Sequence, residues 1–175
     1  YYIGQQLIED IGTEAAAVIG IGGEPTSVSA NTRDDGFKDA IKVNPNAKVD
    51  ALVNGKDEET TGLRVTTEML QGNPTMNIVY SDTEPAALGA AAAIKELGLE
   101  DKVKLYAFVD KNGVKMIMDG KMVAGAIQEP ARLAQIQVEN IKKYLEGDTS
   151  LEYIVNSPPL LVNSDNAEEV LPAAY

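Results

Sequence analysis

Residues 81–98, SDTEPAALGAAAAIKELG, join the polar end of a strand to the start of a long helix. A short apolar run at 76–80 precedes this segment and gives way abruptly to the polar residues 81–84. The Ala- and Leu-rich residues that follow favour a helix over 83–97, because these residue types have high helix propensity. In open parallel α/β sheets, ligands bind where strands deliver side chains in this way. The segment therefore predicts both a parallel α/β sheet and the edge at which a site is expected.

The same strand–helix unit recurs along the rest of the chain. Short apolar runs bounded by Gly, Pro or polar residues predict buried strands, and longer segments with apolar residues at helical spacing predict helices. The expected strands are 15–21, 49–53, 76–80, 103–109 and 123–127, and the expected helices are 3–11, 30–43, 58–70, 83–97, 113–118 and 130–145. Strands that alternate with helices at this spacing predict right-handed βαβ units. We therefore expect an α/β fold with three layers built around an open parallel sheet.

The chain has 175 residues, a formal net charge of −12, and neither His nor Cys. A chain of this length is large enough for one domain with a substantial core. The acidic balance argues against nucleic acid and against an anionic membrane surface, because both need clustered Lys and Arg. No apolar run of the sequence approaches the roughly 20 residues of a membrane-spanning helix. We therefore expect one acidic domain that binds no nucleic acid.

The absence of Cys and His narrows the chemistry that the chain can perform. Without Cys there is no disulfide, thiol nucleophile or Cys-based metal site, and without His the usual general base is missing. Acidic runs such as 57–59 and 34–35 are better interpreted as helix-start charges that the helix dipole favours. The run 20–23, GIGG, lacks the spacing of a dinucleotide-binding motif. We expect no enzyme activity, no cofactor and no metal site.

Polar residues end three of the expected strands, and the ends of parallel strands meet at one edge of a sheet. The polar tips are 81–84, 110–112 and Gln128. Helix capping explains one polar residue at a strand end, and Asp82 is expected to serve as such a cap, but capping does not need several in succession. Neutral and acidic side chains at adjacent strand ends suit a hydroxyl-rich ligand better than a phosphate.

Arg33 is a further candidate, within the segment NTRDDGF at 31–37. Its planar donors suit vicinal hydroxyls or a carboxylate, whereas the helix dipole slightly disfavours a cation in the first turn of a helix. The alternative interpretation is a surface ion pair with Asp34, Asp35 or a neighbouring residue. The spacing alone favours the ion pair, so a binding role for Arg33 depends on the wider pattern of the chain.

Four segments together resemble the second lobe of the type 1 periplasmic sugar-binding proteins, of the ribose- and galactose-binding kind. The segments are NTRDDGF at 31–37, SDTEPAALG at 81–89, VKLYAFVD at 103–110 and MDGKMVAGAIQEP at 118–130. Their order and spacing agree with the family over nearly the whole chain. The resemblance implies two similar lobes, each flavodoxin- or Rossmann-like, joined by three crossovers. Sugar would bind in the cleft between them, which closes by a hinge.

The resemblance also maps individual residues onto the sugar site. Arg33 falls on the family's sugar-contacting arginine, Thr83 on a position where Asn often contacts the sugar, and Gln128 on the hinge-side glutamine. Phe108 matches an aromatic residue that precedes a ligand-binding Asp. The full set of candidate ligand-binding residues is Arg33, Thr83, Glu84, Phe108, Asp110 and Gln128.

Two positions depart from the family pattern. Val109 stands where the family has its ligand-binding Asp, and Asp110 comes one residue later. Asp57 stands where an aromatic residue often stacks on the sugar ring, and the chain has no Trp. The pocket is therefore expected to prefer a different ligand or to contact it differently.

The resemblance divides the chain into three parts. These are an α/β ligand-binding lobe at 1–128, a helix and strand that cross to a first lobe at 129–156, and a returning strand and tail at 157–175. The crossing strand is expected at 151–155 and the returning strand at 160–162. The helix at 130–145 carries an apolar stripe, which either covers the sheet or packs against a partner outside this chain.

The function implied by the resemblance is that of the substrate-binding component of an ABC-type sugar importer, present here as one lobe. Its ligand would be a monosaccharide or a similar polyol. Its partners would be the transporter's membrane subunits and either the missing first lobe or a second copy docked on helix 130–145. The protein would be extracytoplasmic, in the periplasm or lipid-anchored at the cell surface. Because the chain opens inside a helix without a leader, we expect a processed or truncated product.

Three alternatives remain open from the sequence. The effector-binding core of a lactose-repressor-type transcription regulator shares the fold, although it would need an upstream helix-turn-helix. An enzyme on a flavodoxin-like scaffold would show activity that depends on one carboxylate. An interaction protein would use helix 130–145 as a dimerisation surface.

Overall fold

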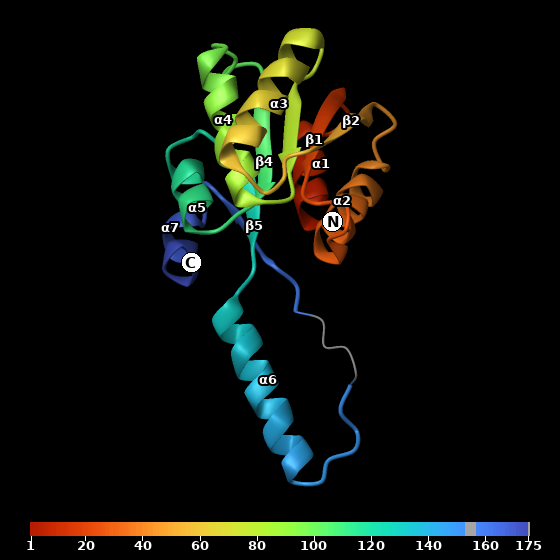
Figure 1. Ribbon diagram of the computed structural model, residues 1–175, viewed down its shortest axis with the longest axis vertical. Coiled ribbons are helices and arrows are strands. Elements are labelled where there is room, and N and C mark those ends of the chain that lie inside the picture. Colours follow the sequence, from red (N-terminus) through yellow and green to blue (C-terminus); the bar gives the residue numbers. More distant parts are fainter. Residues whose placement is uncertain (153–156, 175) are drawn as a thin grey trace.

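The computed structural model describes residues 1–152 and 157–174 of the chain. These residues form one α/β unit from which a single long helix projects (Figure 1). In chain order the elements are α1 (Tyr2–Ile11), β1 (Ala16–Gly22), α2 (Val28–Ile41), β2 (Ala47–Asn54), α3 (Glu59–Gly72), β3 (Ile78–Ser81), α4 (Glu84–Glu96), β4 (Lys104–Phe108), α5 (Lys111–Met118), β5 (Ala124–Ile127), α6 (Pro130–Leu145), β6 (Leu160–Asn163), α7 (Ala167–Val170) and the 3₁₀ turn η1 (Leu171–Ala173).

The strands form one sheet in the order β2-β1-β3-β4-β5-β6. The first five are parallel, which confirms the predicted βαβ units. The sheet is nevertheless mixed, because β6 pairs antiparallel to β5, with Val162 opposite Gly125. The predicted open parallel sheet is therefore confirmed, with one antiparallel strand added at this edge. The chain leaves β5 into α6 and returns directly to the same edge, so no right-handed crossover turns β6 into the parallel direction.

Helices cover both faces of the sheet and produce two cores, as expected of a three-layer fold. On one face, Leu7 of α1 and Phe37 of α2 pack on Val18 and Tyr106. On the other face, α3, α4, α5 and α7 pack on strand residues such as Leu105. Strands β3 and β5 are buried along their whole length, whereas the edge strand β2 alternates between half-buried and exposed residues. The strand ends are therefore held from both sides.

The predicted element boundaries agree with the structure to within two or three residues. Helix α2 begins at Val28, before the expected residue 30, because the Ser27 hydroxyl accepts a hydrogen bond from the backbone N–H of Ala30 and caps the helix. Helix α1 ends before Gly12, whose positive φ of 58° suits glycine. At α2, the capping residue rather than the apolar pattern fixes where the helix begins.

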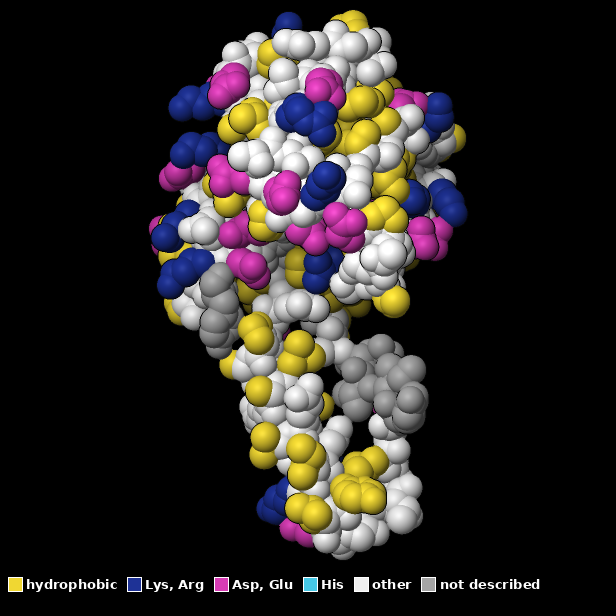
Figure 2. Space-filling view, viewed as in Figure 1, with side chains coloured by type: hydrophobic (Ala, Val, Ile, Leu, Met, Phe, Trp, Pro, Cys, Tyr) yellow, Lys and Arg dark blue, Asp and Glu magenta, His cyan; other side chains and the backbone are white. Residues whose placement is uncertain are grey.

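Helix α6 extends away from the sheet, and none of its residues is buried (Figure 1). Val138, Ile141, Tyr144 and Leu145 are 60–78% exposed, and Figure 2 shows apolar side chains along the projecting arm. The helix therefore does not cover the sheet of its own chain. Residues 153–155 of the strand expected at 151–155 lie outside the described residues. Within the part of the chain that is described, no helix is long and apolar enough to cross a membrane.

Candidate functional site

A pocket of about 440 Å³ opens at the carboxyl ends of β3, β4 and β5, beside α1 and α2. Three of the six candidate residues line it, namely Arg33, Phe108 and Gln128. Tyr80, at the end of β3, contributes part of the apolar wall, and Ser157 lies on the returning segment. The volume falls within the range of small-molecule sites. Residues at or near the carboxyl ends of three predicted strands therefore border one cavity, but of the predicted polar tips only Gln128 lines it.

Arg33 is held in place by two contacts at this edge. Its Nη1 donates a hydrogen bond of 2.9 Å to the backbone oxygen of Asp82, and its guanidinium carbon lies 3.7 Å from the centroid of the Phe108 ring. A guanidinium stacked on an aromatic ring gains a cation–π attraction. Arg33 forms no ion pair with Asp34 or Asp35, so the surface-pair interpretation is wrong. The position of Arg33 is therefore set by the Phe108 ring at the end of β4 and by the backbone directly after β3.

Glu84 connects the ends of two neighbouring strands. Its Oε2 accepts hydrogen bonds of 2.7 Å from the backbone N–H groups of both Asp110 and Gly113. This carboxylate therefore satisfies two donors at the start of α5 that have no partner within the helix. Asp110 is exposed and occupies the N-cap position without a capping bond from its own side chain. One oxygen of Glu84 is thus committed to holding the loop after β4.

Thr83 is half-buried at the N-cap of α4, and its side chain makes no capping bond there. Its Oγ1 is buried and has no hydrogen-bond partner among residues 1–152 and 157–174. A buried hydroxyl without a partner is uncommon in folded proteins. Thr83, Glu84 and Asp110 do not line the pocket that contains Arg33, so the candidate residues separate into two groups.

Asp82 is completely buried and ties the end of β3 to the loop after β1. Its Oδ2 accepts a 2.9 Å hydrogen bond from the backbone N–H of Gly23. The expectation that Asp82 caps the following helix is therefore wrong, because the N-cap residue is Thr83 and the carboxylate turns across the sheet instead. Burial raises the pKa of Asp82, against the opposing effects of the Gly23 N–H and Arg33.

Asp34 is a buried acid, whereas the sequence interpretation assigned it to a helix-start charge or a surface ion pair. It is only 5% exposed, and its Oδ1 has no hydrogen-bond partner within the described residues. Burial, followed by the charge of Asp82, raises the pKa of Asp34 to about 7. Residue 34 lies on the same helical stripe as Ala30, Phe37 and Ile41, which are all buried. The 3.6-residue period of α2 was the signal that could have found it.

The two residues that depart from the family pattern, Val109 and Asp57, lie in different surroundings. Val109 is 1% exposed and packs in the core, so it presents no group to the pocket. Asp57 follows Lys56 in a turn in which both residues have φ of 53°. Its Oδ1 lies close beside Gly23, where a Cβ atom would come within 2.7 Å of it. The described residues contain no group of three or more acidic side chains that could hold a metal ion.

Comparison with known proteins agrees with this architecture. The D-ribose/D-allose-binding protein of Pseudomonas aeruginosa is 28% identical over 93% of this chain and 50% of its own length. The D-apiose import binding protein of Actinobacillus succinogenes is 28% identical over 95% of this chain and 54% of its own length. The chain thus spans about half the length of these curated relatives.

Solved structures show the same fold. A periplasmic solute-binding protein of an Actinobacillus succinogenes ABC transporter, solved with bound D-allose, superposes with a TM-score of 0.87 at 24% identity, covering 97% of this chain and 60% of the other. A Mycobacterium smegmatis protein in complex with β-D-fucofuranose gives 0.83 at 25% identity, covering 98% and 57%. The family model described as periplasmic binding protein domain matches residues 1–149. The chain therefore belongs to the periplasmic binding protein domain family.

Proposed function

We propose that this chain is one ligand-binding lobe of the substrate-binding component of an ABC-type sugar importer. It would contribute one wall of a cleft for a monosaccharide or a similar polyol. The observation that carries the proposal is the convergence of Arg33, Phe108 and Gln128 on a single pocket at the strand ends. The names of the relatives reported above favour the importer over a lactose-repressor-type regulator, which shares the fold.

The donors of Arg33 support a neutral, oxygen-rich ligand. A guanidinium carries five N–H donors, and the hydrogen bond to the Asp82 backbone oxygen uses one of them. Among the side chains that line the pocket, Arg33 is the one with a formal charge at neutral pH. Vicinal hydroxyls can accept two of its remaining donors without adding charge. Gln128 adds an amide that can both donate and accept.

The same features support a binding role without catalysis. The pocket combines apolar and aromatic walls with a few polar groups, which is the usual composition of a small-molecule binding site. Its lining contains no carboxylate that could act as a general base. Thr83, Glu84 and Asp110 would lie next to the ligand only if it extends beyond this pocket toward the start of α5.

The projection of α6 away from the sheet supports a division of the chain into three parts. Residues 1–128 would form the lobe, 129–156 would cross to a first lobe, and 157–175 would return. The exposed apolar face of α6 would pack on that first lobe or on a second copy of the chain. The assembled protein would act outside the cytoplasm, in the periplasm or lipid-anchored, and deliver its ligand to membrane subunits of the transporter.

The test is a titration of this chain with D-ribose, D-allose and myo-inositol, followed by saturation-transfer NMR. We expect a dissociation constant of about 1 mM or weaker, because one wall offers only part of the contacts. Arg33→Lys keeps the charge but loses the planar donor fork, so it should abolish the signal. Arg64→Lys, at an exposed arginine of α3 paired with Glu68, is the matched control.

Two results would contradict the proposal. Equal saturation signals from Arg33→Lys and Arg64→Lys would remove the pocket from the binding function. Submicromolar affinity of the monomeric chain would show that one lobe already forms a complete site, against the proposed half-site.

A further inference from the structure

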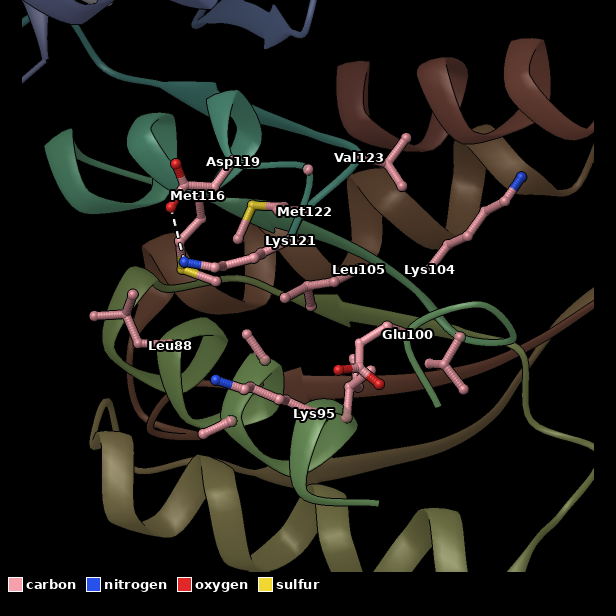
Figure 3. Close-up of a pocket in the computed structure, with 15 residues that line it drawn as sticks. Leu88, Lys95, Glu100, Lys104, Leu105, Met116, Asp119, Lys121, Met122 and Val123 are labelled. Carbon is pink, nitrogen blue, oxygen red and sulfur yellow. Dashed lines mark hydrogen bonds and ion pairs between the residues drawn. The ribbon is translucent and has the colours of Figure 1, made fainter. Parts of the chain in front are cut away.

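A second cavity, of about 540 Å³, lies between α4 and α5, away from the pocket that contains Arg33 (Figure 3). Its floor is apolar and includes Leu105, Met116 and Met122. Leu105 and Met122 are only 1% and 3% exposed, so the cavity reaches down to the sheet. We call this cavity the α4–α5 groove. It lies beside the amino end of β4, whereas the proposed sugar pocket is at the carboxyl ends.

One face of α4 forms a wall of the groove. Leu88, Ala91, Ala92 and Lys95 line it, at positions i, i+3, i+4 and i+7 of the helix. Residues at this spacing form one continuous stripe on a helix surface. The small side chains of the two alanines leave space where larger residues would fill the gap. Leu88, Ala91 and Ala92 are half-buried and Lys95 is exposed, so part of this stripe faces the open groove.

The packing of α4 on α3 explains why the groove stays open. A Cβ atom on Gly89 would collide with the backbone of Glu59 and Leu63, and one on Gly62 would collide with the backbone of Ala86. The two glycines thus allow the backbones of α3 and α4 to approach very closely. Helix α4 therefore packs closely against α3 and makes few contacts with α5. The groove is therefore a consequence of the fold, not of one side-chain rotamer.

The rim of the groove reverses the charge balance of the chain. The whole chain has 15 basic and 27 acidic residues, whereas the groove is lined by three lysines and two acids. Lys121 is paired with Asp119 at 2.7 Å. Lys95 and Lys104 form no ion pair among residues 1–152 and 157–174. Figure 3 shows the Lys104 side chain pointing away from the middle of the groove, whereas Lys95 and the second acid, Glu100, lie along its opposite wall.

We propose that the α4–α5 groove binds a small amphiphilic anion, a carboxylate that carries a short apolar chain or ring. The apolar part would lie on Leu105 and the two methionines, whose flexible thioethers adapt to irregular ligands. The carboxylate would meet Lys95 at the mouth, where attraction is partly screened by solvent. The volume suits a ligand of this size.

The test uses this chain with ¹³C-labelled methionine methyl groups, titrated with octanoate. We expect the Met116 and Met122 signals to shift and saturate with a dissociation constant of about 1 mM or tighter, as for a ligand of about ten heavy atoms. Met76, buried in the core, and Met118, which is 44% exposed and outside the groove lining, should not move. Octylammonium, with the same chain and opposite charge, should bind more weakly.

Two variants assign the binding to the groove. Lys95→Glu should weaken octanoate binding about fivefold or more, whereas Lys143→Glu, the same charge change on the projecting helix α6, should not. Ala92→Phe should occupy the groove and abolish the shifts, with an unchanged Met76 signal to show that the core is intact.

The proposal is overturned by unshifted Met116 and Met122 signals at about 10 mM octanoate, tenfold above the expected dissociation constant. Equal affinity for octylammonium, or equal octanoate affinity in Lys95→Glu and Lys143→Glu, overturns it as well.

Discussion

Replacing Asp34 by Asn should stabilise the protein at alkaline pH and leave it almost unchanged at acid pH. The Asp34 carboxyl is buried, and burial together with the charge of Asp82 raises its pKa from 3.8 to about 7. The folded state therefore holds a proton on Asp34 over a pH range in which the unfolded chain has released it. Stability then falls as the pH rises from about 4 to 7 and is constant above that range.

The size of the expected change in the free energy of unfolding follows from the shift in the pKa of Asp34. Each pKa unit corresponds to about 1.4 kcal/mol, so a shift of about three units gives at most ~4 kcal/mol at pH 8. The amide side chain of the variant carries no charge at any of these pH values, so Asp34→Asn should raise the free energy of unfolding by about 2–4 kcal/mol at pH 8. At pH 4 the carboxyl is protonated in the folded state and about half protonated in the unfolded chain, so the two proteins should differ by only about 0.6 kcal/mol.

Urea unfolding of both proteins between pH 4 and pH 9 measures this difference directly. Asp35→Asn is the matched control, because Asp35 is the adjacent carboxyl, is 76% exposed, and lies 3.6 Å from Lys38. That variant should keep the wild-type dependence on pH. The reasoning fails if Asp34→Asn and the wild type show parallel curves, or if the variant is less stable at pH 8.

Two further variants test the packing and the loop anchoring. Gly89→Ala should cost about 3 kcal/mol or more, because a Cβ there collides with the backbone of α3; Gly72→Ala, where a Cβ meets nothing within 4 Å, should be neutral or slightly stabilising in thermal unfolding. Glu84→Gln should cost about 1–3 kcal/mol, because it weakens two charge-assisted bonds to backbone N–H groups. Hydrogen exchange at Gly113 should accelerate in Glu84→Gln but not in Glu96→Gln, at an exposed acid in the last turn of α4, and equal exchange in both would remove the anchoring role.

The sequence predicts the layered sheet because the pattern of apolar residues in its strand segments differs clearly from the pattern in its helix segments. Buried strands such as β5 are continuous runs of apolar residues and glycine, since helices cover both faces of the sheet, and a helix follows each of the first five strands. The direction of β6 could not be predicted in this way. The run 160–162 has the composition of any buried strand, and pairing direction depends on where the connection returns, which the local pattern does not encode.

The sequence predicts that polar residues lie at the strand ends, but not which hydrogen bonds each of them makes. Their place at strand ends follows from the alternation of elements, whereas their hydrogen-bond partners are distant in sequence. Asp82 bonds to Gly23, 59 residues away, and Glu84 bonds to Gly113, 29 residues away. Asp34 was the exception, because its burial follows from the helical period alone.

These hydrogen bonds indicate that the polar side chains at the strand ends have different roles. The carboxylates of Asp82 and Glu84 accept from backbone N–H groups, so they fix the loops after β1 and β4. Arg33 is fixed in turn by the Asp82 backbone and by the Phe108 ring, which leaves most of its donors without a protein acceptor in the described chain. A cation with unused donors, on loops that other residues hold rigid, is prepared to accept an oxygen-rich ligand without rearrangement. In the proposed site, the acids at this edge would therefore supply rigidity, and Arg33 would supply the recognition.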